Sequence, residues 1–173
     1  MAIPFSLKTI ATIQTNEEGI QGVVDTLLGL DQHILVSDYP FGDGGPEIIA
    51  LVGELGSGKT TLAKALFKTW GSTETVNSPT FGLVNEYSLP NFKGILYHHD
   101  WYRVNEAGEL YDAGIEDILH EYPSKQVIEW PEIGDFLLRD LADNYKAKVM
   151  WVHIKHIHDM REYRLSIRSN ESV

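Results

Sequence analysis

The stretch GELGSGKTT, residues 53–61, decides the fold that this sequence predicts. It fits the pattern G-x-x-x-x-G-K-[ST], with Gly53, Gly58, Lys59 and Thr60 at the defining positions. The apolar run EIIALV leads into it and predicts a buried strand, and residues 60–70 continue with the apolar period of a helix. A strand, a glycine-rich loop and a helix in this order predict a phosphate-binding loop, or P-loop.

The chemistry of such a loop assigns a role to each residue. Backbone N–H groups that turn inward would surround phosphate oxygens, and the helix N-terminus would add positive potential. Lys59 would span the β- and γ-phosphates, and the Thr60 hydroxyl would ligate Mg²⁺. We therefore expect the phosphates of a nucleotide to bind at Gly53, Gly56, Ser57, Gly58, Lys59, Thr60 and Thr61.

Strand and helix patterns alternate along the rest of the chain. Helices are expected over 60–70, over 106–121 with a break near Gly114, and after a cap at Thr15 or Asn16. Expected strands cover 34–36, 47–52, 83–87, 95–100, 126–129, 148–154 and 164–167. This alternation predicts an α/β protein: one P-loop domain over residues 1–173, in three layers, with a mixed, mostly parallel sheet flanked by helices.

The composition narrows the function classes. With 14 Lys+Arg against 25 Asp+Glu, the formal net charge is −11, which argues against strong independent nucleic-acid binding. That charge fits either docking on a basic partner or solubility alone. There are no cysteines, no signal-peptide pattern and no apolar window of membrane-spanning length, so the default expectation is a cytoplasmic protein without a membrane partner.

Two carboxylates follow apolar strands. ILYHHD ends at Asp100, and QVIE ends at Glu129 before Trp130 and a proline. A P-loop site needs one strand-end carboxylate to hold Mg²⁺ or its water and another to orient the attacking water. The residues alone do not divide these roles. The segment NSPTF, after the P-loop helix, offers the Thr80 hydroxyl as a γ-phosphate sensor.

Three P-loop classes compete for this pattern. A GTPase is disfavoured, because no Asp has Gly three residues later and no [NT]-K-x-D motif occurs. A small metabolite kinase fits the length, but such kinases usually close an arginine-rich lid, and this chain has five arginines with none adjacent. An ATPase that hydrolyses nucleotide to drive a partner is the third class and is the one we favour.

Taken in order, GELGSGKTT, NSPTF, NEY, HHDWYR and IEWPE resemble the TsaE (YjeE) family over about Thr15 to Arg164. This is the family of small ATPases in bacterial tRNA threonylcarbamoyladenosine (t6A) synthesis. The resemblance implies that the bound nucleotide is ATP or ADP, and that ATP is hydrolysed with Mg²⁺ in support of the TsaD and TsaB proteins, which form the transferase. Contact with tRNA would be indirect, through that complex.

The resemblance also implies roles for individual residues. Gly56 to Thr61 would bind phosphates, and Thr60 and Glu129 would ligate Mg²⁺. Asp100 would be the acid needed for hydrolysis, although it and Glu129 could exchange the metal and water roles. The remaining family positions are Thr80 as the switch, Trp130 near the nucleotide or the partner, Asn16 or Glu17 near the base, and Arg161 as a further nucleotide contact. Met160 stands where the family often has Gly, and the loop at 37–46 is longer than usual.

Overall fold

The computed structural model describes residues 6–29, 45–79, 82–89 and 94–168. The expected strand at 34–36 and Thr80 lie outside these residues, as does most of the 37–46 loop. The strands are β1 (Leu7–Thr15), β2 (Ile48–Val52), β3 (Val84–Ser88), β4 (Ile95–Asp100), β5 (Ser124–Glu129), β6 (Val149–Ile157) and β7 (Met160–Arg168). The helices are α1 (Ile20–Leu27), α2 (Lys59–Thr69), α3 (Ala107–Asp112), α4 (Ile115–Leu119) and α5 (Asp135–Asn144), with a 3₁₀ turn over Pro131–Gly134.

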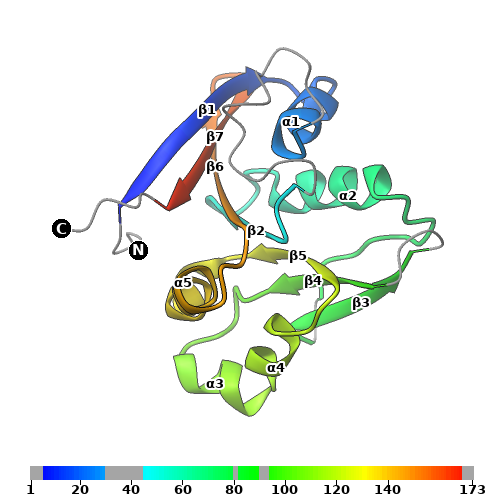
Figure 1. Cartoon of the computed structure of the whole chain (residues 1–173). Coiled ribbons are helices and arrows are strands. Elements are labelled where there is room, and N and C mark those ends of the chain that lie inside the picture. Colours follow the sequence, from blue (N-terminus) through cyan, green and yellow to red (C-terminus); the bar gives the residue numbers. More distant parts are fainter. Residues whose placement is uncertain (1–5, 30–44, 80–81, 90–93, 169–173) are drawn as a thin grey trace.

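The seven strands form one sheet in the order β1-β7-β6-β2-β5-β4-β3 (Figure 1). The four central strands, β6, β2, β5 and β4, are parallel to one another. The remaining pairings are antiparallel: β3 joins β4 at one edge, and β7 and β1 extend the sheet beyond β6. The carboxyl ends of β2, β4 and β5 therefore meet at one edge of the parallel core, where ligands bind in open α/β sheets.

Apolar side chains on the two faces of the sheet build two cores. Strand β2 shows the alternation: Ile49 and Leu51 pack with α1 and α2, whereas Ile48 and Ala50 pack with α3, α4 and α5. Figure 1 shows α1 and α2 on one side of the sheet and the other three helices on the opposite side. Because β2 buries both faces, it reads as a continuous apolar run. The predicted three-layer, mixed α/β fold is confirmed.

Three local features differ from the sequence-based expectation. Strand β1 and helix α5 were not expected from the sequence. The cap of α1 was expected at Thr15 or Asn16, which is wrong: Thr15 still belongs to β1, and the cap residue is Gly19 without a side-chain cap bond. Asn16 stabilises the intervening turn instead, because its Oδ1 accepts the N–H of Gly19 at 3.3 Å.

None of the helices in the described segments has the length and apolar character needed to cross a membrane.

Candidate nucleotide site

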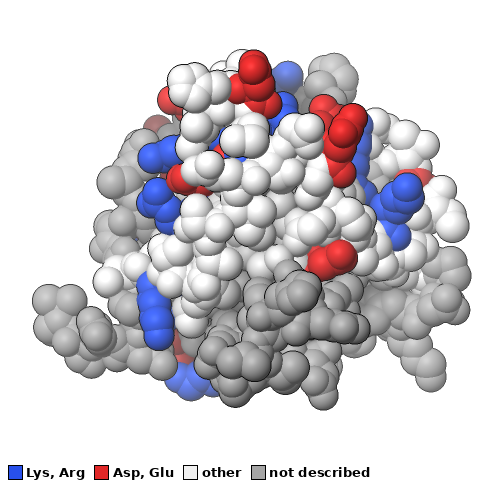
Figure 2. All heavy atoms as spheres, turned by 90° about the horizontal axis from the view of Figure 1, so that it is seen from above, with Lys and Arg blue, Asp and Glu red and all other residues white. Residues whose placement is uncertain are grey.

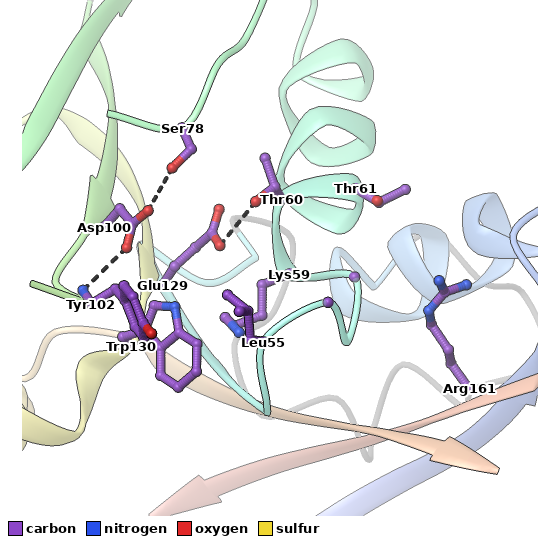
Figure 3. A pocket seen from close by; sticks show the side chains of 12 residues that line it. Leu55, Lys59, Thr60, Thr61, Ser78, Asp100, Tyr102, Glu129, Trp130 and Arg161 are labelled. Atoms are coloured by element: carbon purple, nitrogen blue, oxygen red, sulfur yellow. Dashed lines mark hydrogen bonds between the residues drawn. The ribbon is translucent and has the colours of Figure 1, made fainter. Parts of the chain in front are cut away.

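A cavity of about 310 Å³ opens where the P-loop meets the ends of β4 and β5 (Figure 3). Its lining combines the loop, the first turn of α2 and the two strand-end carboxylates. The residues are Leu55, Gly56, Gly58, Lys59, Thr60, Thr61, Ser78, Asp100, Tyr102, Glu129, Trp130 and Arg161. Most predicted site residues are thus gathered on one cavity.

The P-loop backbone needs its glycines at two positions. Gly56 and Gly58 have φ of 76° and 104°, in the left-handed region that disfavours other residues. A Cβ at Gly58 would also lie 3.0 Å from Nε of Arg161. Gly58 is the cap residue of α2, so the loop can turn its N–H groups toward the cavity at the helix N-terminus.

Lys59 is folded into the loop that carries it. Its Nζ donates to the carbonyls of Gly53 at 2.7 Å and Glu54 at 2.9 Å, and lies 3.7 Å from the centre of the Trp130 ring. Burial lowers the pKa of Lys59, while Glu129, Glu132 and Asp100 act in the opposite direction. The ammonium is therefore a poorly hydrated cation among carboxylates, positioned to exchange carbonyl partners for phosphate oxygens.

Glu129 links β5 to the P-loop helix. One carboxylate oxygen, Oε2, accepts the hydroxyl of Thr60 at 3.0 Å, and the other, Oε1, lies 2.9 Å from Nε2 of His98. The side chain is only 4% exposed. Two oxygen donors from different elements thus converge beside the P-loop, and oxygen donors are what Mg²⁺ prefers.

Asp100 lies beside Glu129 in the parallel register of β4 and β5. Residues in register on adjacent strands point to the same face, so both carboxylates project toward α2. Asp100 has different partners, however: Oδ2 accepts the hydroxyl of Ser78, and Oδ1 accepts the N–H of Tyr102 at 3.1 Å. Figure 3 shows Glu129 between Asp100 and Thr60.

Trp130 turns the chain sharply after Glu129. It has φ of 59° and ψ of 52°, a left-handed conformation that is strained for a bulky residue, directly before Pro131. Its N–H donates to the carbonyl of Leu51 at 3.3 Å, and its ring packs against Tyr102 with centroids 4.9 Å apart. The strained turn places the indole over Lys59, at the rim of the cavity.

Arg161 reaches the site from the antiparallel extension, whereas Glu17 does not line the cavity. Arg161 lines the cavity and pairs with Thr15 in the β1–β7 register, so the turn that contains Glu17 begins next to it. Both residues lie close enough to Tyr163 to affect its pKa. Burial raises the pKa of Tyr163, Arg161 lowers it, and Glu17 raises it. Figure 3 shows Arg161 on the opposite side of the P-loop from Asp100.

Two predicted phosphate-loop residues do not line this cavity. Gly53 and Ser57 line a neighbouring one of about 280 Å³, together with His153 and His156. The Ser57 side chain is buried, and its hydroxyl has no hydrogen-bond partner within the described part of the chain. Gly53 and Ser57 therefore support the loop in this structure, and their expected phosphate contact stays a prediction.

Sequence reasoning missed three lining residues. Ser78 belongs to the NSPTF segment, from which Thr80 was chosen, and its bond to Asp100 could not be read from spacing. Tyr102 is 54% exposed, whereas its neighbour Trp101 is buried. Leu55 is 74% exposed at the mouth of the cavity. An apolar residue in the middle of a P-loop is the one signal that could have drawn attention to Leu55.

The family model described as "Threonylcarbamoyl adenosine biosynthesis protein TsaE" matches residues 28–164 of this chain. The chain belongs to the TsaE family. It is 39% identical to a Rickettsia typhi protein named tRNA threonylcarbamoyladenosine biosynthesis protein TsaE over 105 residues, 60% of this chain and 70% of the relative. A Haemophilus influenzae protein of the same name is 35% identical over 123 residues, 71% of this chain and 72% of its own.

A solved structure supports the fold of this TsaE-family chain. The crystal structure of Bacillus subtilis YdiB superposes with a TM-score of 0.60, covering 95% of this chain and 89% of that one. At 21% identity this likeness speaks for the fold alone. The recognition of the TsaE family from the sequence motifs is thus confirmed by an independent match, and so is the P-loop architecture.

Proposed function

We propose that this TsaE-family chain is a Mg²⁺-dependent ATPase that acts with the TsaD and TsaB proteins in tRNA t6A synthesis. The observation that carries the proposal is the contact between Thr60 and Glu129, beside Asp100, at the mouth of a P-loop. A nucleotide-binding adaptor would need the loop but not two converging strand-end carboxylates. Their presence favours hydrolysis.

The donor set fits a magnesium ion. Thr60 and Glu129 would hold it, directly or through water, and both supply oxygen atoms. When bound, Mg²⁺ would offset negative charge on the β- and γ-phosphates. Lys59 would leave the carbonyls of Gly53 and Glu54 to bind the same phosphates.

Asp100 would orient the water that attacks the γ-phosphate. Its two hydrogen bonds fix the carboxylate while part of it remains exposed to the cavity. The bond from Ser78 also ties Asp100 to the segment that contains Thr80, which lies outside the described residues. This link supports a switch in which Thr80 binds the γ-phosphate. The accompanying movement of the segment would act on Asp100 through its hydrogen bond with Ser78.

The positions of the arginines support stimulation of ATP hydrolysis by a partner protein. Arg161 is the only arginine among the described residues that line the cavity, and it lies across the P-loop from Asp100. Arg103 lines a second cavity that Asp100 shares, but among the described residues no arginine on the Asp100 side of the P-loop lines the nucleotide cavity itself. We therefore expect intrinsic turnover to be slow. A partner in the complex could complete the site.

The surface charge fits indirect contact with tRNA. In Figure 2 the described Lys and Arg residues (blue) are interspersed with Asp and Glu (red), and much of that face is white. On this face the described residues form no large cluster of cations of the kind that phosphate-backbone binding needs. The formal net charge of −11 agrees with this.

Labelled ATP tests the proposal directly. Phosphate release should rise when TsaD, TsaB and tRNA are added to this chain with Mg²⁺, and Lys59→Ala should abolish it. If release stays flat with all partners present, the partner-driven ATPase is wrong. Transfer of phosphate to a small metabolite would favour the kinase alternative instead.

A further inference from the structure

His98 forms a buried pair with Glu129 that the proposed hydrolysis does not by itself require. Its Nε2 lies 2.9 Å from Oε1 of Glu129, and the two side chains are 0% and 4% exposed. His98 comes from β4 and Glu129 from β5, so the pair joins two neighbouring strand ends. The Phe67 ring of α2 packs against the imidazole with centroids 5.7 Å apart.

In this pair, the two oxygens of the Glu129 carboxylate have different partners. Oε1 is bound by His98, which leaves Oε2 for the hydroxyl of Thr60 on the cavity side. A glutamate side chain held at only one oxygen can still rotate about its last torsion. With both oxygens held, the carboxylate has one orientation. The oxygen that faces the P-loop helix is thereby defined before any ion arrives.

The direction of this hydrogen bond follows from its chemistry. An ionised carboxylate can only accept, so the imidazole donates from Nε2. The other nitrogen, Nδ1, is buried and has no hydrogen-bond partner among the described residues. Glu129 is therefore the single polar contact of the His98 side chain among the residues that the structure describes.

We propose that His98 is a positioning residue for Mg²⁺: it holds Glu129 with one oxygen turned toward Thr60 and the phosphates. This inference rests on the proposed function, because it assigns Glu129 to the metal. Partners of this kind, which orient a metal ligand from behind, typically change metal affinity or activity by roughly 10–100-fold when removed.

The next residue on the strand offers a matched control. His99 is also 0% exposed, but it points to the opposite face, where its Nε2 lies 3.0 Å from Oε1 of Gln126. It packs against Trp101 in the other core, away from the P-loop. Changes at His99 thus disturb the same strand and a comparable buried hydrogen bond without touching Glu129.

The test compares His98→Phe, His98→Gln and the same two changes at His99. Binding of a fluorescent ATP analogue is titrated with Mg²⁺ and repeated in EDTA. For His98→Phe we expect the half-saturating Mg²⁺ concentration to rise by roughly 10–100-fold, with metal-free nucleotide affinity unchanged. His98→Gln, which keeps a donor, should recover part of this. The His99 variants should leave the Mg²⁺ requirement unchanged even where they lower the melting temperature.

Separate results would overturn the inference and the proposed function. Equal Mg²⁺ requirements for wild type and both His98 variants would refute the positioning role while leaving the ATPase intact. A wild-type protein that binds nucleotide with no dependence on Mg²⁺ would refute the proposed function and, with it, this inference.

A measurement on the wild-type chain covers the case in which a variant does not fold. Imidazole ¹⁵N–¹H spectra of the metal-free protein should show a protonated Nε2 at His98. Its signals should shift when Mg²⁺ is added with ADP, while those of His99 stay in place. A His98 without a proton on Nε2, or one insensitive to Mg²⁺ when the nucleotide site is filled, would contradict the proposal.

Discussion

Glu129 and Asp100 stand side by side at the ends of β5 and β4, yet their surroundings differ. Glu129 is 4% exposed and is bound by a hydroxyl from the P-loop helix and an imidazole from behind. Asp100 is half-buried, lies between the nucleotide cavity and a second cavity of about 260 Å³, and is held by Ser78 and a backbone N–H. The same position on adjacent strands thus produces one enclosed carboxylate and one that water can reach.

This difference suggests how the two roles are divided. An enclosed carboxylate beside the P-loop threonine suits a cation. In a poorly hydrated site the attraction between the negative carboxylate and the positive ion is weakly screened. A carboxylate open to the cavity suits the attacking water. Three substitutions probe this division, and a fourth, at His99, probes the pH dependence of stability; they are ordered from the largest expected effect on turnover to the smallest.

Asp100→Asn should have the largest effect. Removing a group that orients or deprotonates water typically costs about 10²–10⁴-fold in rate. We expect ATP hydrolysis with all partners present to fall by that factor, while the affinity for MgATP changes only a few-fold. Single-turnover assays and equilibrium binding separate the two quantities. A loss of Mg²⁺-dependent binding that matches the loss of rate would give Asp100 the metal role instead.

Glu129→Gln should act on the metal. The amide keeps the size of the side chain but removes the charge, so the Mg²⁺ concentration for half-maximal nucleotide binding should rise by at least the roughly 10–100-fold expected for His98. Titration with Mg²⁺ measures this, and nucleotide binding in EDTA serves as the reference. An unchanged Mg²⁺ requirement would remove Glu129 from the metal.

Ser78→Ala should weaken the positioning of Asp100. A hydrogen bond to a charged group contributes about 1.5–3 kcal/mol, and the bond from the Tyr102 N–H remains. We expect hydrolysis to fall by about 10-fold without a change in MgATP affinity. Ser72→Ala is the control, because Ser72 accepts the N–H of Glu74 and does not line the cavity. Equal rates of ATP hydrolysis for the two variants would show that the bond from Ser78 is not needed to position Asp100.

His99→Gln should leave turnover unchanged and alter only the pH dependence of stability. Burial lowers the pKa of His99 to about 3, against 6.5 for the ordinary side chain. The unfolded chain therefore binds a proton that the folded one does not, and His99 reduces the free energy of unfolding as the pH falls from 6.5 toward 3. The slope is about 1.4 kcal/mol per pH unit.

Urea denaturation of the wild type and His99→Gln between pH 7 and 5 measures this contribution. The wild type should lose more stability on acidification than the variant, and the difference should disappear above pH 7. If the free energy of unfolding depends on pH in the same way for the two proteins, His99 takes up its proton in the folded state as well, which would contradict the prediction.

The parts of the fold that were missed had specific physical reasons. Strand β1 is an edge strand with a register shift between Thr9 and Ala11, which breaks the apolar alternation that would reveal it. Helix α5, in contrast, carries a readable signal: Leu137, Leu138 and Leu141 are buried on one face at helical spacing. Local periodicity therefore suffices to predict this helix. Strands β6 and β7 are longer than expected because they pair as a hairpin over polar as well as apolar positions.

The sequence by itself determined the P-loop, the parallel strands around it, the family and the two carboxylates, because loop conformation and strand burial depend on residues that are neighbours in the chain. The period of a strand also accounts for the opposite orientation of His98 and His99, which bond to Glu129 and Gln126 on different faces. Tertiary structure alone decided which partner each group has: Thr60 and His98 for Glu129, Ser78 for Asp100, and Trp130 for Lys59. These contacts join separate elements, and the distances depend on how helices pack on the sheet, which no local pattern encodes.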